Sequence, residues 1–338
     1  MRLLTLFFLL LSVLYGDKTL KIATYNVENL FDLKKDGYEY KEYIPNTQSN
    51  WNQKTYKIKL NNISRVIKEL DADIIVLQEI ESLVALKDLR FTLKRQGLYY
   101  QYYKIANYKN TTTKVALLSK IPFVYTHEVA VTPTYKYRNI LEAKFAINTQ
   151  ELYVLINHWK SKSGPESQRV FSAKKLMKRV SELGEEKNII LIGDFNSHYE
   201  EYKMFKRKRK HNDTGGITGI NHILKSVAHT KSAQETKIDK GEFYNLWYDE
   251  KVTQRYSYIY KSNKETLDNI LISSSLLKPQ GISYIPKSIH SYKPGYLFKG
   301  KSIYRWQITR SQMPKHKGMG YSDHLPLIAK FLVRSKSN

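Results

Sequence analysis

The 338-residue chain contains no cysteine, which excludes disulfide bonds, thiolate metal sites and a cysteine nucleophile. The folded state must therefore depend on core packing, alone or together with a bound metal ion. Acidic residues are also few, because 56 lysines and arginines stand against 31 aspartates and glutamates, giving a formal net charge of +25. A charge of this size attracts polyanions, with nucleic acid as the leading candidate and an anionic membrane surface as the second.

Long hydrophobic runs are absent after the first residues of the chain. The sequence MRLLTLFFLLLSVLYG combines one arginine, a short apolar run and a small residue, which is the pattern of a secretory signal peptide. Its apolar run is shorter than the roughly 20 residues that a spanning helix needs. We predict a signal peptide over residues 1–16, a protein exported to the periplasm or the medium, and no integral membrane contact after cleavage. An uncleaved membrane anchor is the weaker alternative.

Short apolar segments alternate along the chain with amphipathic ones. The amphipathic segments 63–70 and 173–183 each place apolar residues on one helical face, and Ser163 and Glu166 before the second have the spacing of a capping box. This pattern predicts one α/β domain over residues 17–334, with layered sheets, outer helices and a short tail at 335–338. The apolar segments predict strands, most of them too apolar to have one face in water, at residues 20–27, 72–80, 114–119, 151–159, 188–196, 267–273 and 324–333.

Polar residues stand at the ends of these predicted strands, where a layered α/β fold gathers a site. A carboxylate beside an apolar run is costly to bury unless it is paired or binds a metal ion. For most of these residues taken singly, a turn, a cap or a core histidine is an equally good explanation. Glu79 is the least ambiguous, because it lies inside the apolar segment IIVLQEI. The set comprises Asn26, Glu28, Glu79, His158, Asp194, Asn196, Asp268, Asp323 and His324.

The same residues carry a resemblance to the endonuclease/exonuclease/phosphatase superfamily, which includes deoxyribonuclease I, abasic-site endonucleases and bacterial sphingomyelinases. The blocks TYNVENLF, VLQEI, NHWKSK, GDFNS, LDNILIS and YSDHLP occur in the family's order over residues 20–333. The chain resembles an exported, bacterial-type, deoxyribonuclease I-like member. This resemblance implies a four-layer α/β/β/α sandwich, in which two mixed β-sheets pack face to face between outer helices.

The resemblance also implies a divalent metal site. Glu79 would be the main ligand, Asn26 and Asp323 would lie near or on the metal ion, and Glu28 would contribute through water. Oxygen ligands without thiols favour Mg²⁺, with Mn²⁺ or Ca²⁺ as alternatives.

Further roles carried over from the family concern the phosphate. Asp194 would orient or deprotonate the attacking water, and Asn196 would hold a phosphate oxygen. His324 would bind the scissile phosphate or act as acid or base, with Asp268 hydrogen-bonded behind it. A carboxylate behind an imidazole fixes its tautomer and raises its pKa, which suits phosphate binding. His158 matches a second histidine shared by deoxyribonuclease I-like and sphingomyelinase-like members.

One departure from the deoxyribonuclease I pattern concerns this second histidine. In that enzyme a carboxylate from a preceding segment lies behind it, whereas here no acidic residue occurs from Arg90 to His127. We therefore expect His158 to lack an orienting acid or to take one from another segment.

Basic residues near the predicted site point to a polyanionic substrate. The run KMFKRKRKH follows the GDFNS block, although a solvated basic loop is an equal explanation for it. Residues 269–322 contain no acid and interleave basic residues with aromatic ones, and such residues contact phosphates and stack on bases. The predicted substrate-binding residues are Arg138, Lys160, Lys162, Lys206, Arg207, Lys208, Arg305 and Trp306.

These observations together predict a monomeric, exported, Mg²⁺-dependent nuclease that cleaves DNA rather than RNA with little sequence specificity. Two alternatives stay open. A lipid phosphodiesterase of the sphingomyelinase type would need an exposed aromatic hairpin, for which GYLFKG at residues 295–300 is a candidate. A catalytically inactive nucleic-acid-binding protein would have lost metal or phosphate residues, and the principal ones are present.

Overall fold

A computed structural model describes residues 16–108, 111–205, 211–226, 232–309 and 311–335. The predicted signal peptide, apart from Gly16, and residues 336–338 of the predicted tail lie outside this range. Among the described residues, no helix has both the length and the apolar character that a membrane crossing requires.

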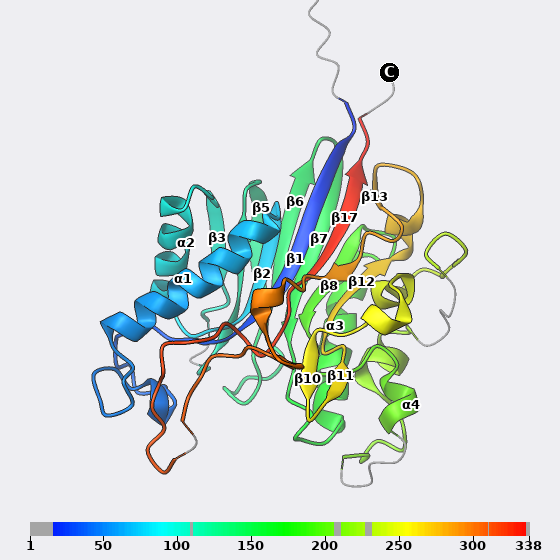
Figure 1. Cartoon of the computed structure of the whole chain (residues 1–338). Helices are drawn as coiled ribbons and strands as arrows, with labels where there is room; N and C mark the ends of the chain where they lie inside the picture. The colour runs from blue at the N-terminus through cyan, green and yellow to red at the C-terminus, as the bar shows by residue number, and fades with distance from the viewer. Residues whose placement is uncertain (1–15, 109–110, 206–210, 227–231, 310, 336–338) are drawn as a thin grey trace, which may run out of the picture.

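Two mixed β-sheets form the centre of the described structure (Figure 1). The first sheet has the order β13 (Ile282–Tyr284), β17 (Leu327–Val333), β1 (Lys18–Leu30), β2 (Ile74–Ile80), β4 (Lys114–Ser119) and β3 (Tyr102–Ile105), with β14 (His290–Ser291) beside β17. The second has the order β5 (Phe123–Val129), β6 (Ile140–Ile147), β7 (Gln150–His158), β8 (Ile189–Asp194), β12 (Asp268–Ser273) and β9 (Phe243–Asn245). Two short ribbons pair β10 (Tyr258–Tyr260) with β11 (Asn263–Glu265) and β15 (Phe298–Lys299) with β16 (Ser302–Ile303).

The helices cover the outer faces of the two sheets. Helices α1 (Gln53–Leu70) and α2 (Leu83–Arg95) share one apolar cluster with the first sheet, in which Ile63 packs with Tyr25 and Leu77. Helix α3 (Ser167–Leu183) shares another cluster with the second sheet, and α4 (Glu201–Phe205) is a short helix after β8. This arrangement confirms the predicted four-layer sandwich.

The third apolar cluster lies between the sheets and explains why the strands are apolar on both faces. In β8, Ile190 and Ile192 point to the other sheet, whereas Ile189 and Leu191 point to α3. Alternate side chains of a strand face opposite sides of its sheet, so a strand covered on both sides needs apolar residues at nearly every position.

The predicted capping box before α3 is wrong. The helix begins at Ser167, and the Glu166 carboxylate accepts hydrogen bonds from Arg169 Nε at 2.7 Å and from the Gly219 amide at 2.9 Å. Glu166 and Arg169 are both buried, and a buried guanidinium needs a carboxylate partner. This requirement outweighs a local cap at Ser163.

The topology brings the polar strand ends to one edge of the sandwich. Strands β1 and β2 are parallel and end at this edge, as do the parallel strands β7 and β8. Strands β12 and β17 are antiparallel to their neighbours and therefore begin there. The start of β1 and the end of β17 lie together at the opposite edge (Figure 1).

Candidate active site

Three predicted site residues lie in one row across the second sheet. His158 on β7 is in register with Asp194 on β8, and Asp194 is in register with Asp268 on β12. Residues in register on neighbouring strands have adjacent side chains, so strand pairing alone brings an imidazole and two carboxylates together.

The first sheet contributes its residues through irregular backbone. The pairing of β1 with β2 shifts register between Asn26 and Leu30, and Glu28, Asn29 and Glu79 have φ values of 51°, 61° and 66°. Such left-handed conformations cost about 1–3 kcal/mol each for residues other than glycine. Local hydrogen bonds offset part of this cost, since the Asn29 amide donates to Glu79 Oε2 at 2.9 Å. The result is that the Glu79 carboxylate reaches the edge cavity instead of continuing the strand pattern.

Asn26 links the two sheets. Its Nδ2 donates to Glu79 Oε1 at 3.2 Å and to Asp194 Oδ2 at 3.1 Å, while its Oδ1 accepts from the Glu28 amide at 3.0 Å. The side chain is buried. Asn26 therefore lies beside the predicted metal site, but it turns its nitrogen rather than its oxygen toward the carboxylates.

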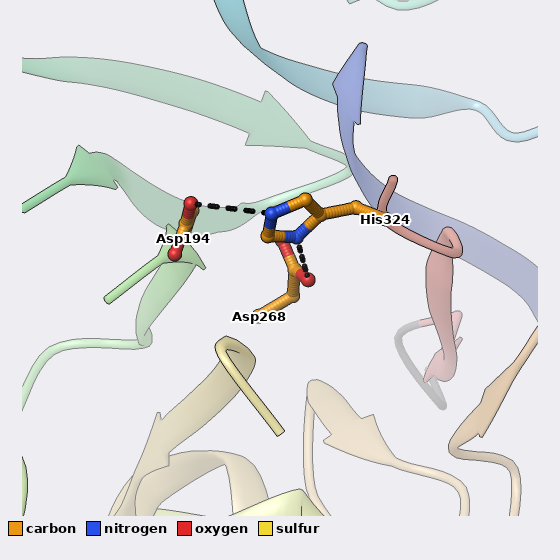
Figure 2. A group of neighbouring side chains, drawn as sticks. All are labelled: Asp194, Asp268 and His324. Atoms are coloured by element: carbon orange, nitrogen blue, oxygen red, sulfur yellow. Dashed lines mark hydrogen bonds and ion pairs between the residues drawn. The ribbon is translucent and has the colours of Figure 1, made fainter. Parts of the chain in front are cut away.

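His324 lies between two aspartates (Figure 2). Its Nδ1 is 2.7 Å from Asp268 Oδ2, and its Nε2 is 3.9 Å from Asp194 Oδ2. Burial lowers the pKa of His324, but the Asp268 and Asp194 carboxylates outweigh burial and raise this pKa well above its usual value. The arrangement is the one that the family resemblance implies for Asp268 and His324. The three side chains are also close enough to surround a metal ion, but a protonated imidazole is not a metal ligand.

His158 has a different environment from His324. Its Nε2 is 3.5 Å from Asp194 Oδ2 and 3.9 Å from Glu79 Oε1, and its buried Nδ1 has no hydrogen-bond partner among the described residues. Burial, together with the positive charge of Arg138, holds the pKa of His158 well below its usual value. No orienting acid stands behind this histidine in the described part of the chain.

These side chains open into a cavity of 380 Å³ at the edge of the sandwich. Asn26, Glu28 and Asp268 are not among the residues that line it. The sequence had not pointed to Tyr40 and Tyr258, which line it, because nothing distinguishes them among 27 tyrosines. The lining residues are Tyr40, Glu79, Arg138, His158, Lys160, Ser161, Asp194, Asn196, Tyr258, Leu267, Asp323 and His324.

The positively charged side chains of the site do not fully balance its acidic residues. Burial and the nearby Asp323 raise the pKa of Glu79, and burial raises the pKa of Asp194 to about 7. A divalent cation beside such carboxylates would favour their charged forms, and oxygen donors suit a hard cation such as Mg²⁺. The residues present therefore fit a metal ion, which Glu79 and Asp323 would hold, and Asp194 is the third carboxylate that lines the cavity.

The contacts of Glu28 do not favour its predicted role as a water-mediated metal ligand. The buried carboxylate accepts hydrogen bonds from Arg305 Nε at 2.8 Å and from the Trp306 amide at 2.9 Å. Arg305 is also 3.3 Å from Asp323. Glu28 thus anchors the segment before His324. Arg305 balances Glu28 and Asp323 while its side chain remains exposed, so its predicted contact with a substrate stays a prediction.

Two predicted substrate-binding residues, Trp306 and Lys162, are engaged within the protein. Trp306 is buried, and its Nε1 donates to His316 Nδ1 at 2.7 Å, so its ring cannot stack on a base. Lys162 donates to Glu201 Oε2 at 2.8 Å and to Glu265 Oε2 at 2.9 Å, which neutralises its charge outside the cavity. Arg138 and Lys160 do line the cavity, whereas Lys206, Arg207 and Lys208 lie outside the described residues.

Lys59 supports the backbone around the site and was not predicted from the sequence. Its Nζ is buried and donates to the carbonyl oxygens of Glu28 and Tyr321, both at 2.9 Å. It therefore ties the end of β1 to the segment that precedes Asp323. The signal was available, because Lys59 lies four residues before Ile63 on the apolar face of a predicted helix.

The chain resembles several solved structures, all at an identity that shows the fold alone. TDP2 of D. rerio in complex with a single-strand DNA product has a TM-score of 0.57 at 14% identity, covering 93% of this chain and 98% of that one. An endonuclease/exonuclease/phosphatase family protein of Bacteroides thetaiotaomicron has a TM-score of 0.56 at 15% identity, with coverages of 94% and 99%. A mannosyl-6-phosphatase of the same organism has a TM-score of 0.55 at 14% identity, with coverages of 92% and 99%.

A comparison with curated proteins gives no match. A family model described as Endonuclease/Exonuclease/phosphatase family matches residues 21–332. Members of this family are hydrolases that act on phosphoester bonds with a divalent metal ion. The present chain belongs to the endonuclease/exonuclease/phosphatase family.

Proposed function

We propose that the protein is an exported, Mg²⁺-dependent phosphodiesterase that cleaves nucleic acid, DNA rather than RNA, with little sequence specificity. The observation that carries this proposal is the convergence of Glu79, Asp194 and His324 on one cavity whose wall also holds Arg138 and Lys160. Splitting a phosphodiester requires an activated water, neutralised phosphoryl oxygens and a stabilised leaving oxygen.

In the proposed reaction, the side chains divide these three tasks. Asp194, whose Oδ2 lies 3.9 Å from His324 Nε2, orients the attacking water and takes its proton. The His324 imidazolium, held by Asp268, donates a hydrogen bond to the phosphate and a proton to the leaving oxygen. Arg138 and Lys160 offset the charge of the phosphoryl oxygens. A divalent cation at Glu79 and Asp323 would add further charge neutralisation.

Charge supports nucleic acid as the substrate class. The net charge of +25 attracts polyanions. The likeness to TDP2 bound to a single-strand DNA product is in keeping with this class. Non-specific cleavage follows from a site whose basic residues contact phosphates, since such contacts carry no sequence information.

The sphingomyelinase alternative loses its main support. Within residues 295–300, Leu297 is buried, and the Tyr296 hydroxyl donates to Glu69. This segment packs against the protein and does not form an exposed aromatic hairpin. The inactive alternative lacks support as well, because the principal acidic and histidine side chains surround the cavity.

The test compares substrates in parallel on the purified protein with Mg²⁺. Plasmid DNA, RNA, sphingomyelin vesicles, bis(p-nitrophenyl) phosphate and p-nitrophenyl phosphate separate nuclease, lipid diesterase and monoesterase activities. We expect DNA and the small diester to be cleaved, EDTA to abolish cleavage, and His324→Ala to lower the rate about a hundredfold or more.

His290→Ala is the matched control, because it removes an exposed histidine of the same region without touching the cavity. Turnover of sphingomyelin or of the monoester with intact DNA would refute the nuclease proposal. Export is tested by expressing the full chain and sequencing the N-terminus of the protein recovered outside the cytoplasm. Light scattering tests the expected monomer.

A further inference from the structure

A pair of aromatic rings, one half-buried and one exposed, lies next to a residue that lines the catalytic cavity. Lys160, which lines the cavity, places its Nζ 5.4 Å from the ring centroid of Tyr137. The Tyr137 ring lies 5.5 Å from that of Phe171 on α3, and Phe171 is 39% exposed. A phenylalanine that is exposed to this degree on a helix contributes little to the core, so its contact with Tyr137, the neighbour of Lys160, calls for another explanation.

Phe171 is also one wall of a second hollow, with a volume of 390 Å³. Ile217, which is 43% exposed, forms part of another wall. No carboxylate is present among the described residues that line this hollow, which are Ser167, Val170, Phe171, Lys174, Thr214, Ile217 and Ile223. A mostly apolar hollow of this size accepts a flat ring the size of a nucleobase.

The surroundings of the aromatic pair are basic. Lys136 and Lys174 are exposed, and Lys175 Nζ is 5.8 Å from the Phe171 ring. The Asp213 carboxylate accepts a hydrogen bond from the Ser167 amide at 3.0 Å, at the start of α3. Lysines around exposed rings are the combination that single-stranded nucleic acid requires, since ammonium groups contact phosphates and rings stack on bases.

We propose that Tyr137 and Phe171 form a stacking platform for unpaired bases of a nucleic-acid strand whose scissile phosphate lies in the catalytic cavity. This inference rests on the proposed nuclease function and makes it more specific, because it assigns a preference for single-stranded substrate or for strand ends. The two contacts of 5.4 Å and 5.5 Å place the Phe171 ring within about 11 Å of the Lys160 amine. At about 3.4 Å per nucleotide, the spacing of fully stacked bases, this upper limit corresponds to at most about three nucleotides.

Unpaired bases fit this surface better than duplex DNA does. The bases of a duplex are already stacked on one another and do not present a face to a protein ring. A bilayer is also a poorer fit, because the apolar residues line a hollow and do not project as an insertion loop. Both competing occupants are included in the test.

The first measurement compares the full chain with its Phe171→Ala variant on two substrates. One substrate is a short single-stranded oligonucleotide, and the other is bis(p-nitrophenyl) phosphate, which has no nucleobase and no strand that extends from the cavity. Loss of one base–aromatic contact lowers the ratio of oligonucleotide to diester kcat/KM about five- to a hundredfold. Phe171→Trp keeps a stacking ring and retains the ratio of the wild-type protein.

Phe91→Ala is the matched control, because Phe91 is a 61% exposed phenylalanine on α2, which covers the other sheet. We expect it to leave the substrate ratio unchanged. A Phe171→Ala ratio equal to that of the wild type overturns the stacking platform while the nuclease function stands. Failure of the wild-type protein to cleave either substrate overturns the nuclease function and the platform with it.

A binding measurement gives an independent readout. An oligonucleotide with 2-aminopurine two or three positions from its end loses fluorescence when this base stacks on a ring. We expect the slow His324→Ala protein to quench the fluorescence of the single-stranded oligonucleotide. The quenching should be lost when Phe171→Ala is added to this protein, and it should not occur with duplex DNA. Equal quenching with and without Phe171 overturns the proposal. Loss of binding to phosphatidylcholine vesicles in Phe171→Ala, with oligonucleotide binding intact, overturns it in favour of a lipid surface.

Discussion

The buried His316 should make the stability of the protein depend on pH. His316 Nδ1 accepts the hydrogen bond from Trp306 Nε1 at 2.7 Å, and its Nε2 lies 2.8 Å from the carbonyl oxygen of Glu42. These partners require a neutral imidazole that carries its proton on Nε2, because a proton on Nδ1 would face the Trp306 N–H. The ring also packs 4.7 Å from those of Tyr43 and Trp51, measured between centroids.

The size of the effect follows from the displaced pKa. Burial lowers the pKa of His316 from 6.5 to about 4. Because the folded-state pKa lies below the unfolded value, the stabilising contribution is complete above about pH 6.5 and is lost as the pH falls toward about 4. Linkage between proton binding and folding gives a total contribution of about 3 kcal/mol to the free energy of unfolding. About 2 kcal/mol of it is lost between about pH 7.5 and about pH 5.

Urea unfolding of the wild-type protein and of His316→Asn at these two pH values tests this reasoning. Asparagine cannot titrate, so the free-energy cost of the substitution should be about 2 kcal/mol smaller at about pH 5 than at about pH 7.5. His290→Asn, at an exposed site, should cost the same at both pH values within about 0.5 kcal/mol. An equal cost of His316→Asn at both pH values would show that His316 is not the buried neutral group described above.

Three further substitutions test the site and its support. Asp268→Asn removes a charge-assisted hydrogen bond to His324, so initial rates should show kcat lowered about ten- to a hundredfold, with an unchanged circular dichroism spectrum; a rate near that of the wild type would contradict the role of Asp268. Glu79→Gln should raise the Mg²⁺ concentration for half-maximal activity at least about tenfold, and an unaltered metal titration would move the metal ion away from Glu79. Arg169→Met leaves the buried Glu166 without its partner and should cost about 3–5 kcal/mol in urea unfolding, and a change below about 1 kcal/mol would show that the pair is dispensable.

The sequence was a good guide to the strands and to the residues that gather at their ends. Apolar runs such as 188–196 indicated strands with two buried faces, and the structure covers β8 by a sheet on one side and by α3 on the other. The polar ends meet because parallel strands end at the same edge and antiparallel neighbours begin there. This follows from strand direction, which the pairing of segments far apart in the chain decides.

The sequence was a poor guide to which basic and aromatic side chains remain available to a substrate. Trp306 and Arg305 belong to an acid-free segment that was predicted to contact a polyanion. Both donate hydrogen bonds to Glu28, which lies 277 residues before Arg305. Lys162 is neutralised partly by Glu265, 103 residues later. Pairing and burial of this kind depend on partners that no local pattern identifies.

The sequence by itself therefore determined the alternation of strands and helices, because hydrophobic periodicity is a local property. Its six motif blocks carried the resemblance to the family and marked the residues at the strand ends. Only the tertiary structure decided the left-handed backbone that aims Glu79, the orientation of Asn26, and the loss of Trp306 and Lys162 to internal contacts. It also brought Tyr137 and Phe171 together from separate segments, with Tyr137 next to Lys160 of the cavity wall. Distances between such segments are fixed by packing over the whole chain, and packing is what a linear pattern does not record.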